Sequence, residues 1–308
     1  PTPGARQRER LDAGWRFAFG HADDPARDFN FGTYQRTYAK AGKDTADAAL
    51  IAYDDAGWRA LSLPHDWAVE LPFVPNPHPP AGVDDPAAAH GYRPVGRDHP
   101  ETSIGWYRRE LDIPASDAGR RLVLEFDGVF RDCIVFCNGH IVGTNASGYI
   151  GFEVDITDVV DYGARNVIAV RVDATLGEGW FYEGAGIYRH VWLRRTDPLH
   201  VPAGGLVVRA TPRAGQAACA VEATLHNAGD QTEACVLVLQ VLADDGRVVA
   251  KAQLPATQVA PGDATTVQYA LAFEAPQLWS PETPVLYRLL AELRVDSGAP
   301  EARHTPLT

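Results

Sequence analysis

The residues with the clearest capacity for chemistry lie in one short run, GEGWFYEGAGIYRHVWL, at residues 177–193. It combines the carboxylates of Glu178 and Glu183 with four glycines and with aromatic side chains that include Trp180 and Tyr182. Aromatic faces pack on the C–H surface of a sugar ring and carboxylates accept hydrogen bonds from its hydroxyls, so the run is suited to carbohydrate binding. Two other interpretations are open at this point: a catalytic pair of carboxylates, or a structural plug of a β-sheet core.

The elements around this run have the patterns of β-strands. Apolar residues alternate with others in residues 121–126, 166–174 and 188–195, which indicates strands with one buried face. Asn138-Gly139 separates two apolar stretches and predicts a two-residue hairpin, because both residues tolerate a positive φ. Trp106, in the strand-like stretch GWYRREL, is expected to fill the core. The sequence therefore predicts that the first half is an antiparallel sandwich.

A break in the strand pattern follows at residues 194–205, where two prolines and two glycines predict a linker. Six strand-like stretches follow, separated by turns rich in Asp, Asn and Gly. This number of strands is typical of an immunoglobulin-like sandwich. We therefore expect an all-β protein of two domains, at residues 1–200 and 201–308.

Composition narrows the classes of partner. The 308 residues carry a net charge of −12 without a block of Lys or Arg, which argues against nucleic acid and anionic membranes as partners. No run of about 18 apolar residues is present, so we expect no membrane-spanning helix. The start, PTPGARQRER, has no apolar region after its basic residues. We interpret it as a mature or trimmed N-terminus, and we favour a periplasmic or secreted location over the cytoplasm.

The four cysteines are expected to be free thiols. Cys133 and Cys137 lie four residues apart in one strand-like stretch, so they are about 13 Å apart, too far for a disulfide. Cys219 and Cys235 flank a predicted hairpin without being symmetric about its turn. The ten histidines are scattered, and we infer neither a metal site nor a cofactor.

Five stretches together resemble the family 2 glycoside hydrolases, which include β-galactosidases, β-glucuronidases and β-mannosidases. The stretches follow the family's order: LPHDWAVE (63–70), SIGWYRRELDIP (103–114), FDGVFRDCIVFCNGHIVGTNASGYIGFEVDIT (126–157), EGAGIYRHVWL (183–193) and LWSPETPVLYRL (278–289). The resemblance implies a sugar-binding jelly-roll sandwich followed by an immunoglobulin-like sandwich. It also implies a catalytic (β/α)₈ barrel that carries both catalytic glutamates and needs at least about 200 further residues. We expect this barrel to be missing from the chain, which would then be an inactive portion of a retaining exo-β-glycosidase, most simply a β-galactosidase.

The resemblance places the loop before GIYRHVWL at the mouth of the active site, with carbohydrate and the barrel as partners. The substrate-binding candidates are then Glu178, Trp180, Tyr182, Glu183 and Asp66, and no residue of the chain is assigned a catalytic role. For Asp66 the favoured interpretation is a capped backbone turn, with Trp67 packed inward. Glu183 stands where the family commonly has a small polar residue, which leaves the sugar open. The alternatives are a free-standing carbohydrate-binding module, a structural interaction domain, a β-glucuronidase or a β-mannosidase; a homo-oligomer is also open.

Overall fold

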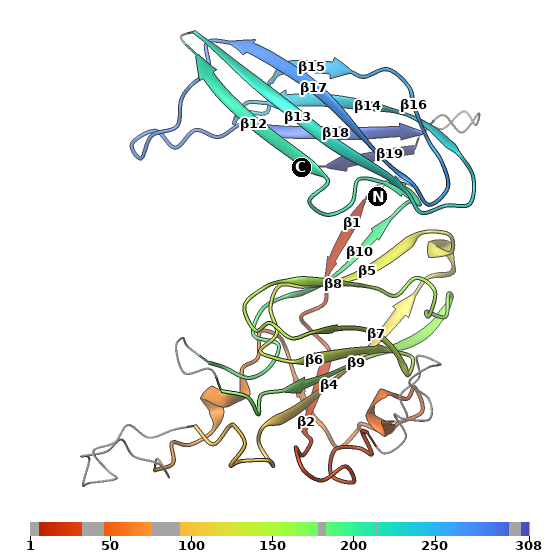
Figure 1. Ribbon diagram of the computed structural model, residues 1–308, viewed down its shortest axis with the longest axis vertical. Coiled ribbons are helices and arrows are strands. Elements are labelled where there is room, and N and C mark those ends of the chain that lie inside the picture. Colours follow the sequence, from red (N-terminus) through yellow and green to blue (C-terminus); the bar gives the residue numbers. More distant parts are fainter. Residues whose placement is uncertain are drawn as a thin grey trace. The chain divides into compact units, whose positions relative to one another are not determined.

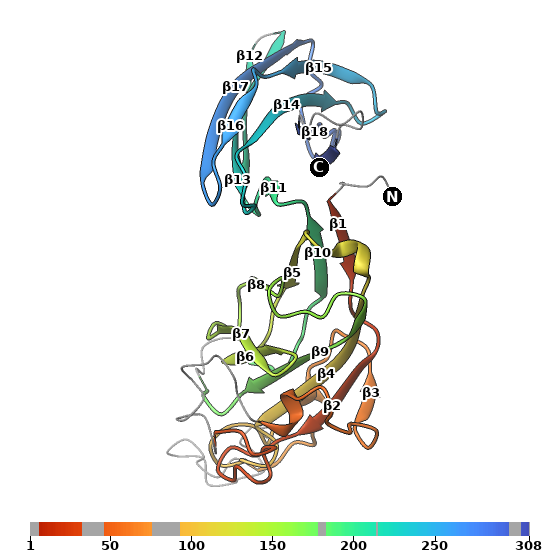
Figure 2. The ribbon, with the colours of Figure 1, turned by 90° about the vertical axis from the view of Figure 1, so that its right-hand side faces the viewer.

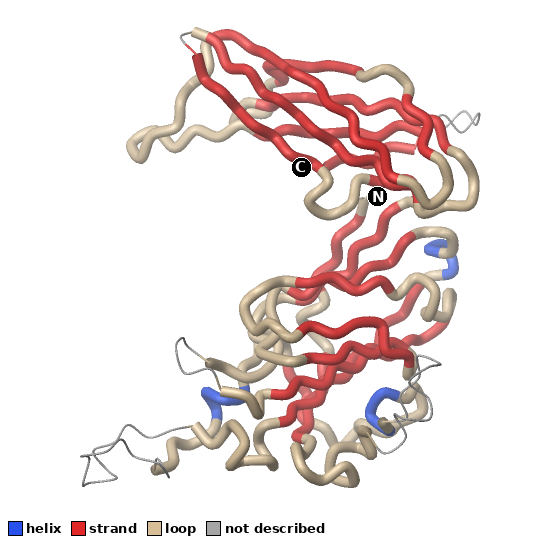
Figure 3. The backbone as a smooth tube through the Cα atoms, in the orientation of Figure 1, coloured by secondary structure: helices blue, strands red, loops and turns tan. Residues whose placement is uncertain are grey.

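The computed structural model describes residues 6–32, 46–75, 93–177, 183–213, 215–295 and 303–307. Strands dominate these residues, and the helices are single 3₁₀ turns such as Asp47–Ala49 and Ala115–Asp117 (Figure 3). The best helical pattern of the sequence, residues 45–52, thus yields only one such turn within its described part. The fold is all-β, as predicted.

The chain divides into two compact units. The N-terminal unit comprises Arg8–Ala118 and Leu122–Arg194, and the C-terminal unit comprises Pro1–Gln7, Gly119–Arg121 and Arg195–Thr308. The predicted boundary near residue 200 stays a prediction, since the C-terminal unit also includes two short segments from earlier in the chain.

A jelly-roll-like sandwich of two sheets is built from the first ten strands (Figure 1). One sheet has the order β3-β2-β4-β9-β6-β7 and the other has the order β1-β10-β5-β8. Figure 2 shows β2, β4 and β9 side by side, and their pairing is antiparallel. The bounds are β1 Gln7–Arg10, β2 Trp15–Phe19, β3 Arg59–Leu61, β4 Ile104–Ile113, β5 Arg121–Phe126, β6 Cys133–Cys137, β7 His140–Asn145, β8 Phe152–Asp155, β9 Ala164–Asp173 and β10 Val191–Thr196.

The core between these sheets follows from the alternation in the sequence. Leu122, Leu124 and Phe126 of β5 are all buried, as predicted, and they pack in one cluster with residues of the facing sheet. The hairpin at Asn138-Gly139 is also confirmed: β6 pairs with β7, and the two turn residues have φ of 52° and 82°. The positive φ values explain why this dipeptide stands between the strands.

The outer face of the six-stranded sheet is covered as well, which the sequence patterns did not indicate. Trp106 fills a second apolar cluster there, as part of a core, together with Phe136, Ala169 and residues of segment 46–49. Two buried arginines hold this layer in place. Arg108 Nε donates to Asp55 Oδ2 at 2.9 Å, and Arg171 Nε donates to Asp28 Oδ2 at 2.9 Å. Buried charges are stable only when they are paired in this way.

The C-terminal unit is an immunoglobulin-like sandwich. In one sheet β13 pairs with β11, β12 and β17, and in the other the order is β15-β14-β18-β19 with β16 also paired to β14. All six predicted strands are present. The bounds are β11 Leu199–His200, β12 Leu206–Arg213, β13 Gln216–Asn227, β14 Glu233–Leu242, β15 Val248–Gln253, β16 Thr257–Val259, β17 Ala264–Glu274, β18 Arg288–Val295 and β19 Arg303–Leu307.

All four cysteines are buried free thiols, as expected. Burial raises the pKa of Cys133 and Cys137 to about 12 and that of Cys235 to about 11, and it also raises the pKa of Cys219. The thiols are therefore core residues rather than nucleophiles.

Candidate functional site

Two of the predicted site residues, Asp66 and Glu183, lie in adjacent segments of the N-terminal unit. The backbone N–H of Ala185, two residues after Glu183, donates to Asp66 Oδ1 at 2.9 Å. Glu178, Trp180 and Tyr182 lie outside the described residues. The structure thus brings together segments that are more than a hundred residues apart in the sequence.

The segment around Asp66 is shaped by a cap. Asp66 precedes the 3₁₀ helix η3, Trp67–Glu70, and its Oδ1 accepts a hydrogen bond from Ala68 N at 3.0 Å. Trp67 is fully buried. A carboxylate at an N-cap satisfies backbone N–H groups that have no partner inside the helix. Both structural expectations, the capped turn and the inward Trp67, are confirmed, whereas contact of Asp66 with a sugar stays a prediction.

Backbone hydrogen bonds align this segment with residues 185–187. His65 N donates to Ile187 O and Trp67 N donates to Ala185 O, both at 2.9 Å. On the other side, Gly186 exchanges two backbone hydrogen bonds with Phe130, at 2.7 and 2.9 Å. Residues 185–187 therefore lie between two partner segments, which fixes the backbone that immediately follows Glu183.

Close packing at Gly186 explains the glycine in this segment. Its φ is +120°, and a Cβ there would lie 2.3 Å from the Tyr107 hydroxyl oxygen and 2.7 Å from the carbonyl oxygen of His65. A Cβ on Gly184 would likewise lie 2.3 Å from Asp66 Oδ2. Side chains at these positions are excluded by their neighbours, so the spacing of the glycines reflects close approach of backbone to buried groups.

A polar network beneath the site was not predicted from the sequence. His65 Nδ1 lies 2.7 Å from the Tyr107 hydroxyl, and its Nε2 lies 3.3 Å from Glu70 Oε1. Arg59 Nη1 donates to Glu70 Oε2 at 2.7 Å. His65 belongs to the LPHDWAVE stretch. The sequence of that stretch does not indicate a hydrogen bond between His65 and a tyrosine 42 residues later.

Burial sets the protonation of this network. It lowers the pKa of His65 and raises that of Tyr107 well above its usual value. The hydrogen bonds from Arg59 lower the pKa of Glu70. The imidazole is therefore neutral and the phenol is protonated near neutral pH, so neither group supplies charge to a reaction. The hydrogen bonds of this network join β4 to the segment around Asp66 and hold that segment in place.

The Glu183 side chain is half-buried and follows directly on segment 178–182. Its Oε2 would lie 3.5 Å from a Cβ built on Gly177, so the carboxylate is close to the residue that precedes segment 178–182. Because Asp66 Oδ1 already accepts two backbone hydrogen bonds, Glu183 and Asp66 do not form the free acid and nucleophile that a retaining glycosidase needs. The backbone that follows Glu183 is held by the hydrogen bonds of residues 185–187.

Exposed apolar side chains accompany this site. Phe19, at the end of β2, makes an edge contact with the Trp67 ring at 6.2 Å between centroids. Val69 and Phe73 are exposed, and the Arg93 guanidinium lies 3.7 Å from the centroid of the Phe73 ring. Apolar surface therefore lies exposed on the segments that adjoin Trp67.

The described residues contain no group of three or more His, Cys, Asp or Glu side chains arranged to hold a metal ion. They also contain no helix that is long and apolar enough to cross a membrane.

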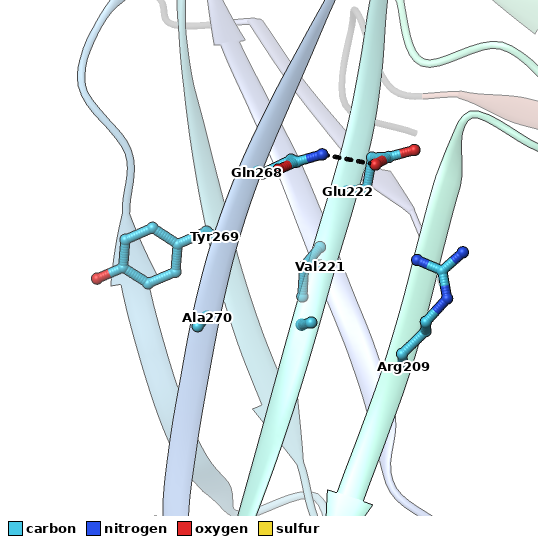
Figure 4. A pocket seen from close by; sticks show the side chains of 7 residues that line it. Arg209, Val221, Glu222, Gln268, Tyr269 and Ala270 are labelled. Atoms are coloured by element: carbon cyan, nitrogen blue, oxygen red, sulfur yellow. Dashed lines mark hydrogen bonds between the residues drawn. The ribbon is translucent and has the colours of Figure 1, made fainter.

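A shallow depression of about 370 Å³ lies in the C-terminal unit, on the sheet formed by β12, β13 and β17 (Figure 4). Arg209, Glu222 and Gln268 surround it, and Gln268 Nε2 donates to Glu222 Oε2 at 2.8 Å. Ala220 and Ala270 leave little more than backbone between them. The depression has no buried polar group that points into it, so we assign it no function.

Comparison with known proteins identifies the family. The sequence model described as "Glycosyl hydrolases family 2, sugar binding domain" matches residues 9–197, and that described as "Glycosyl hydrolases family 2" matches residues 206–305. The chain belongs to family 2 of the glycosyl hydrolases.

Individual relatives agree with this assignment. The chain is 32% identical to β-galactosidase BoGH2A of Bacteroides ovatus over 98% of its own length, and 28% identical to a β-glucuronidase of Formosa agariphila over 83%. A solved family 2 glycosyl hydrolase of Bacteroides cellulosilyticus superposes with a TM-score of 0.74 at 28% identity, over 97% of this chain and 36% of that one. The chain spans about a third of the length of these relatives: 31% and 27% of the two enzymes.

Proposed function

We propose that the chain is the non-catalytic N-terminal portion of a retaining exo-β-glycosidase, a β-galactosidase that hydrolyses terminal β-D-galactosides. The observation that carries the proposal is the match to β-galactosidase BoGH2A, which covers 98% of this chain but only 31% of that enzyme. In this proposal the catalytic carboxylates belong to a barrel in the remaining part of the polypeptide. The two sandwiches, with a boundary near residue 200, then serve as sugar-binding and spacer domains.

Within this portion, the loop that contains Glu183 contributes to the mouth of the active site. Glu183 accepts a hydrogen bond from a hydroxyl of the non-reducing sugar, while Trp180 and Tyr182 offer apolar faces to the ring and Glu178 and Asp66 complete the polar surface. Support for the role of Glu183 comes from the backbone that follows it, which is fixed by hydrogen bonds to both His65 and Phe130. A fixed backbone lowers the entropy lost on binding.

A β-glucuronidase is the second candidate, because relatives of that name match 82% to 83% of the chain at 28% to 30% identity. The two candidates differ at the sugar C6, which is a hydroxymethyl group in galactose and a carboxylate in glucuronic acid. Glu183 would repel the carboxylate, so its negative charge favours the neutral sugar.

The test uses the longer polypeptide encoded when the reading frame continues past codon 308. Its kcat/KM is measured with aryl β-D-galactoside and aryl β-D-glucuronide. We expect a preference for the galactoside, and a loss of about 10- to 100-fold in kcat/KM for Glu183→Gln with an unchanged Tm, the scale of a lost hydrogen bond to a charged group. A preference for the glucuronide would replace the first candidate by the second, and unchanged kinetics in Glu183→Gln would remove the loop from the site.

A further inference from the structure

The loop between β17 and β18 exposes large apolar side chains to solvent (the blue loop joining these strands in Figure 1). Leu278 and Trp279 are each 59% exposed and Leu286 is 65% exposed. Other exposed large apolar residues of the described C-terminal unit, such as Val248 at 45%, lie on strands and are less exposed. Among the described residues of this unit, the most exposed large apolar side chains therefore lie on one short loop.

Hydrogen bonds hold this loop in one shape. Ser280 and Thr283 exchange backbone hydrogen bonds, each 3.1 Å long, and their hydroxyls lie 2.9 Å apart. Gln277 N donates to the Tyr287 hydroxyl at 2.9 Å, which ties the two limbs of the loop together. The Tyr287 ring packs on Phe273, with centroids 5.0 Å apart. The exposed side chains thus stand on a backbone that is already ordered, which is what a preformed binding surface requires.

The composition of the loop matches the centre of a protein interface. Glu282 is the only charged residue in residues 275–287, which contain one Trp, two Leu and three Pro. Interface centres are depleted of charge and enriched in aromatic residues, and Trp is prominent among the residues that dominate binding energy. Clustered apolar side chains on a surface mark sites of interaction when they are contiguous.

We propose that Leu278, Trp279 and Leu286 form a docking surface for the catalytic portion of the longer polypeptide. This inference rests on the proposed function, which supplies that portion. The length of the relatives points to the occupant: this chain covers 31% and 27% of the two enzymes, so most of each enzyme lies outside the matched part. The docking face of the catalytic portion is apolar and uncharged, with a recess that receives the Trp279 ring.

Oxidation by hydroxyl radicals, read by mass spectrometry, tests the docking surface. The 308-residue chain and the longer polypeptide are oxidised in parallel. We expect the rate at Trp279 to fall at least about fivefold in the longer polypeptide, as for a side chain that loses its solvent at an interface centre. Tyr269, which is 40% exposed on β17, is the internal control and keeps its rate.

The outcomes separate the docking surface from the proposed function. A stop codon soon after codon 308 overturns both. A longer polypeptide that hydrolyses glycosides but oxidises at Trp279 as fast as the isolated chain overturns the docking surface alone.

A double variant, Trp279→Ser with Leu286→Ser, gives an independent measurement. In the isolated chain the Tm is expected to stay unchanged, because both residues are exposed. In the longer polypeptide the Tm is expected to fall, whereas the control Val248→Ser changes neither protein. Equal Tm for the wild-type and doubly substituted longer polypeptides contradicts the docking surface.

Discussion

Replacing Gly186 with Ala should destabilise the N-terminal unit far more than the same change at Gly96. The φ of Gly186 is +120° and that of Gly96 is +117°, so both substitutions force an L-residue into nearly the same unfavourable backbone conformation. Around Gly96 no atom lies within 4 Å of the added Cβ, whereas at Gly186 the Tyr107 hydroxyl, the His65 carbonyl and the Trp67 ring lie within 2.3 to 3.0 Å. The pair separates backbone strain from steric exclusion.

The expected magnitudes follow from these two contributions. Backbone strain costs about 1–3 kcal/mol in either variant. At Gly186 the overpacking against buried groups adds about 1–3 kcal/mol, because neither the His65 carbonyl nor the fully buried Trp67 can move freely. Gly186→Ala should therefore lower the free energy of unfolding by about 2–6 kcal/mol, and the excess over Gly96→Ala should be about 1–3 kcal/mol.

Urea unfolding followed by tryptophan fluorescence measures this difference. Six of the seven tryptophans, all but Trp279, belong to the N-terminal unit, so the signal reports mainly on that unit. Equal losses in the two variants would refute the close packing of residues 185–187 against His65 and Trp67. A smaller loss for Gly186→Ala than for Gly96→Ala would do the same.

Three further predictions concern the groups around the site and the core. Asp66→Ala should lower the free energy of unfolding in urea by about 2–4 kcal/mol, because Ala68 N and Ala185 N lose a charged acceptor. Asp66→Asn keeps an oxygen acceptor and should cost less. Equal losses in the two variants would contradict the cap. Burial lowers the pKa of His65 from 6.5, so the unfolded chain binds the proton more readily and stability should fall as the pH drops below about 6.5. His65→Gln should reduce this slope between pH 7.5 and 5.5, and an unchanged slope argues against a buried neutral imidazole. The four buried thiols should not react with Ellman's reagent at about pH 8 until the protein is unfolded, since burial raises their pKa values; rapid labelling of the native chain contradicts that burial.

The strands of this protein could be predicted because their side chains alternate or because a turn residue needs a positive φ. Leu122, Leu124 and Phe126 alternate on one strand, and Asn138-Gly139 leaves few alternatives to a hairpin. Local patterns of this kind predict a strand and its buried side correctly when the tertiary structure buries only one face of the strand.

Where both faces of a strand are buried, the alternation of the sequence predicts the wrong exposure for the residues between the apolar ones. Glu125 looked like a solvent-facing residue of β5, but it is buried and paired with Arg194, whose Nη1 donates to it at 2.6 Å. In β9 the residues between the apolar ones are buried too, because segment 46–49 covers the outer face of that sheet. A period of two residues cannot reveal a layer contributed by a distant, irregular segment.

The sequence predicts which residues belong to the candidate site, but it does not predict the contacts among them. The run at residues 177–193 identified Glu183, and the LPHDWAVE stretch identified Asp66, yet nothing in either sequence indicated that a hydrogen bond joins Asp66 to Ala185. Likewise, Tyr107 meets His65 only because β4 passes beneath the capped turn. Contacts between distant segments depend on topology, which residue types alone do not determine.

The most direct test of the central claim is the hydrolysis of an aryl β-D-galactoside by the 308-residue chain and by the longer polypeptide, at equal molar concentration. If the chain is a non-catalytic portion of a β-galactosidase, turnover occurs with the longer polypeptide and is absent with the isolated chain, because both catalytic carboxylates then belong to the barrel. Turnover by the isolated chain that disappears in Glu183→Gln would contradict this account and make Glu183 a catalytic residue.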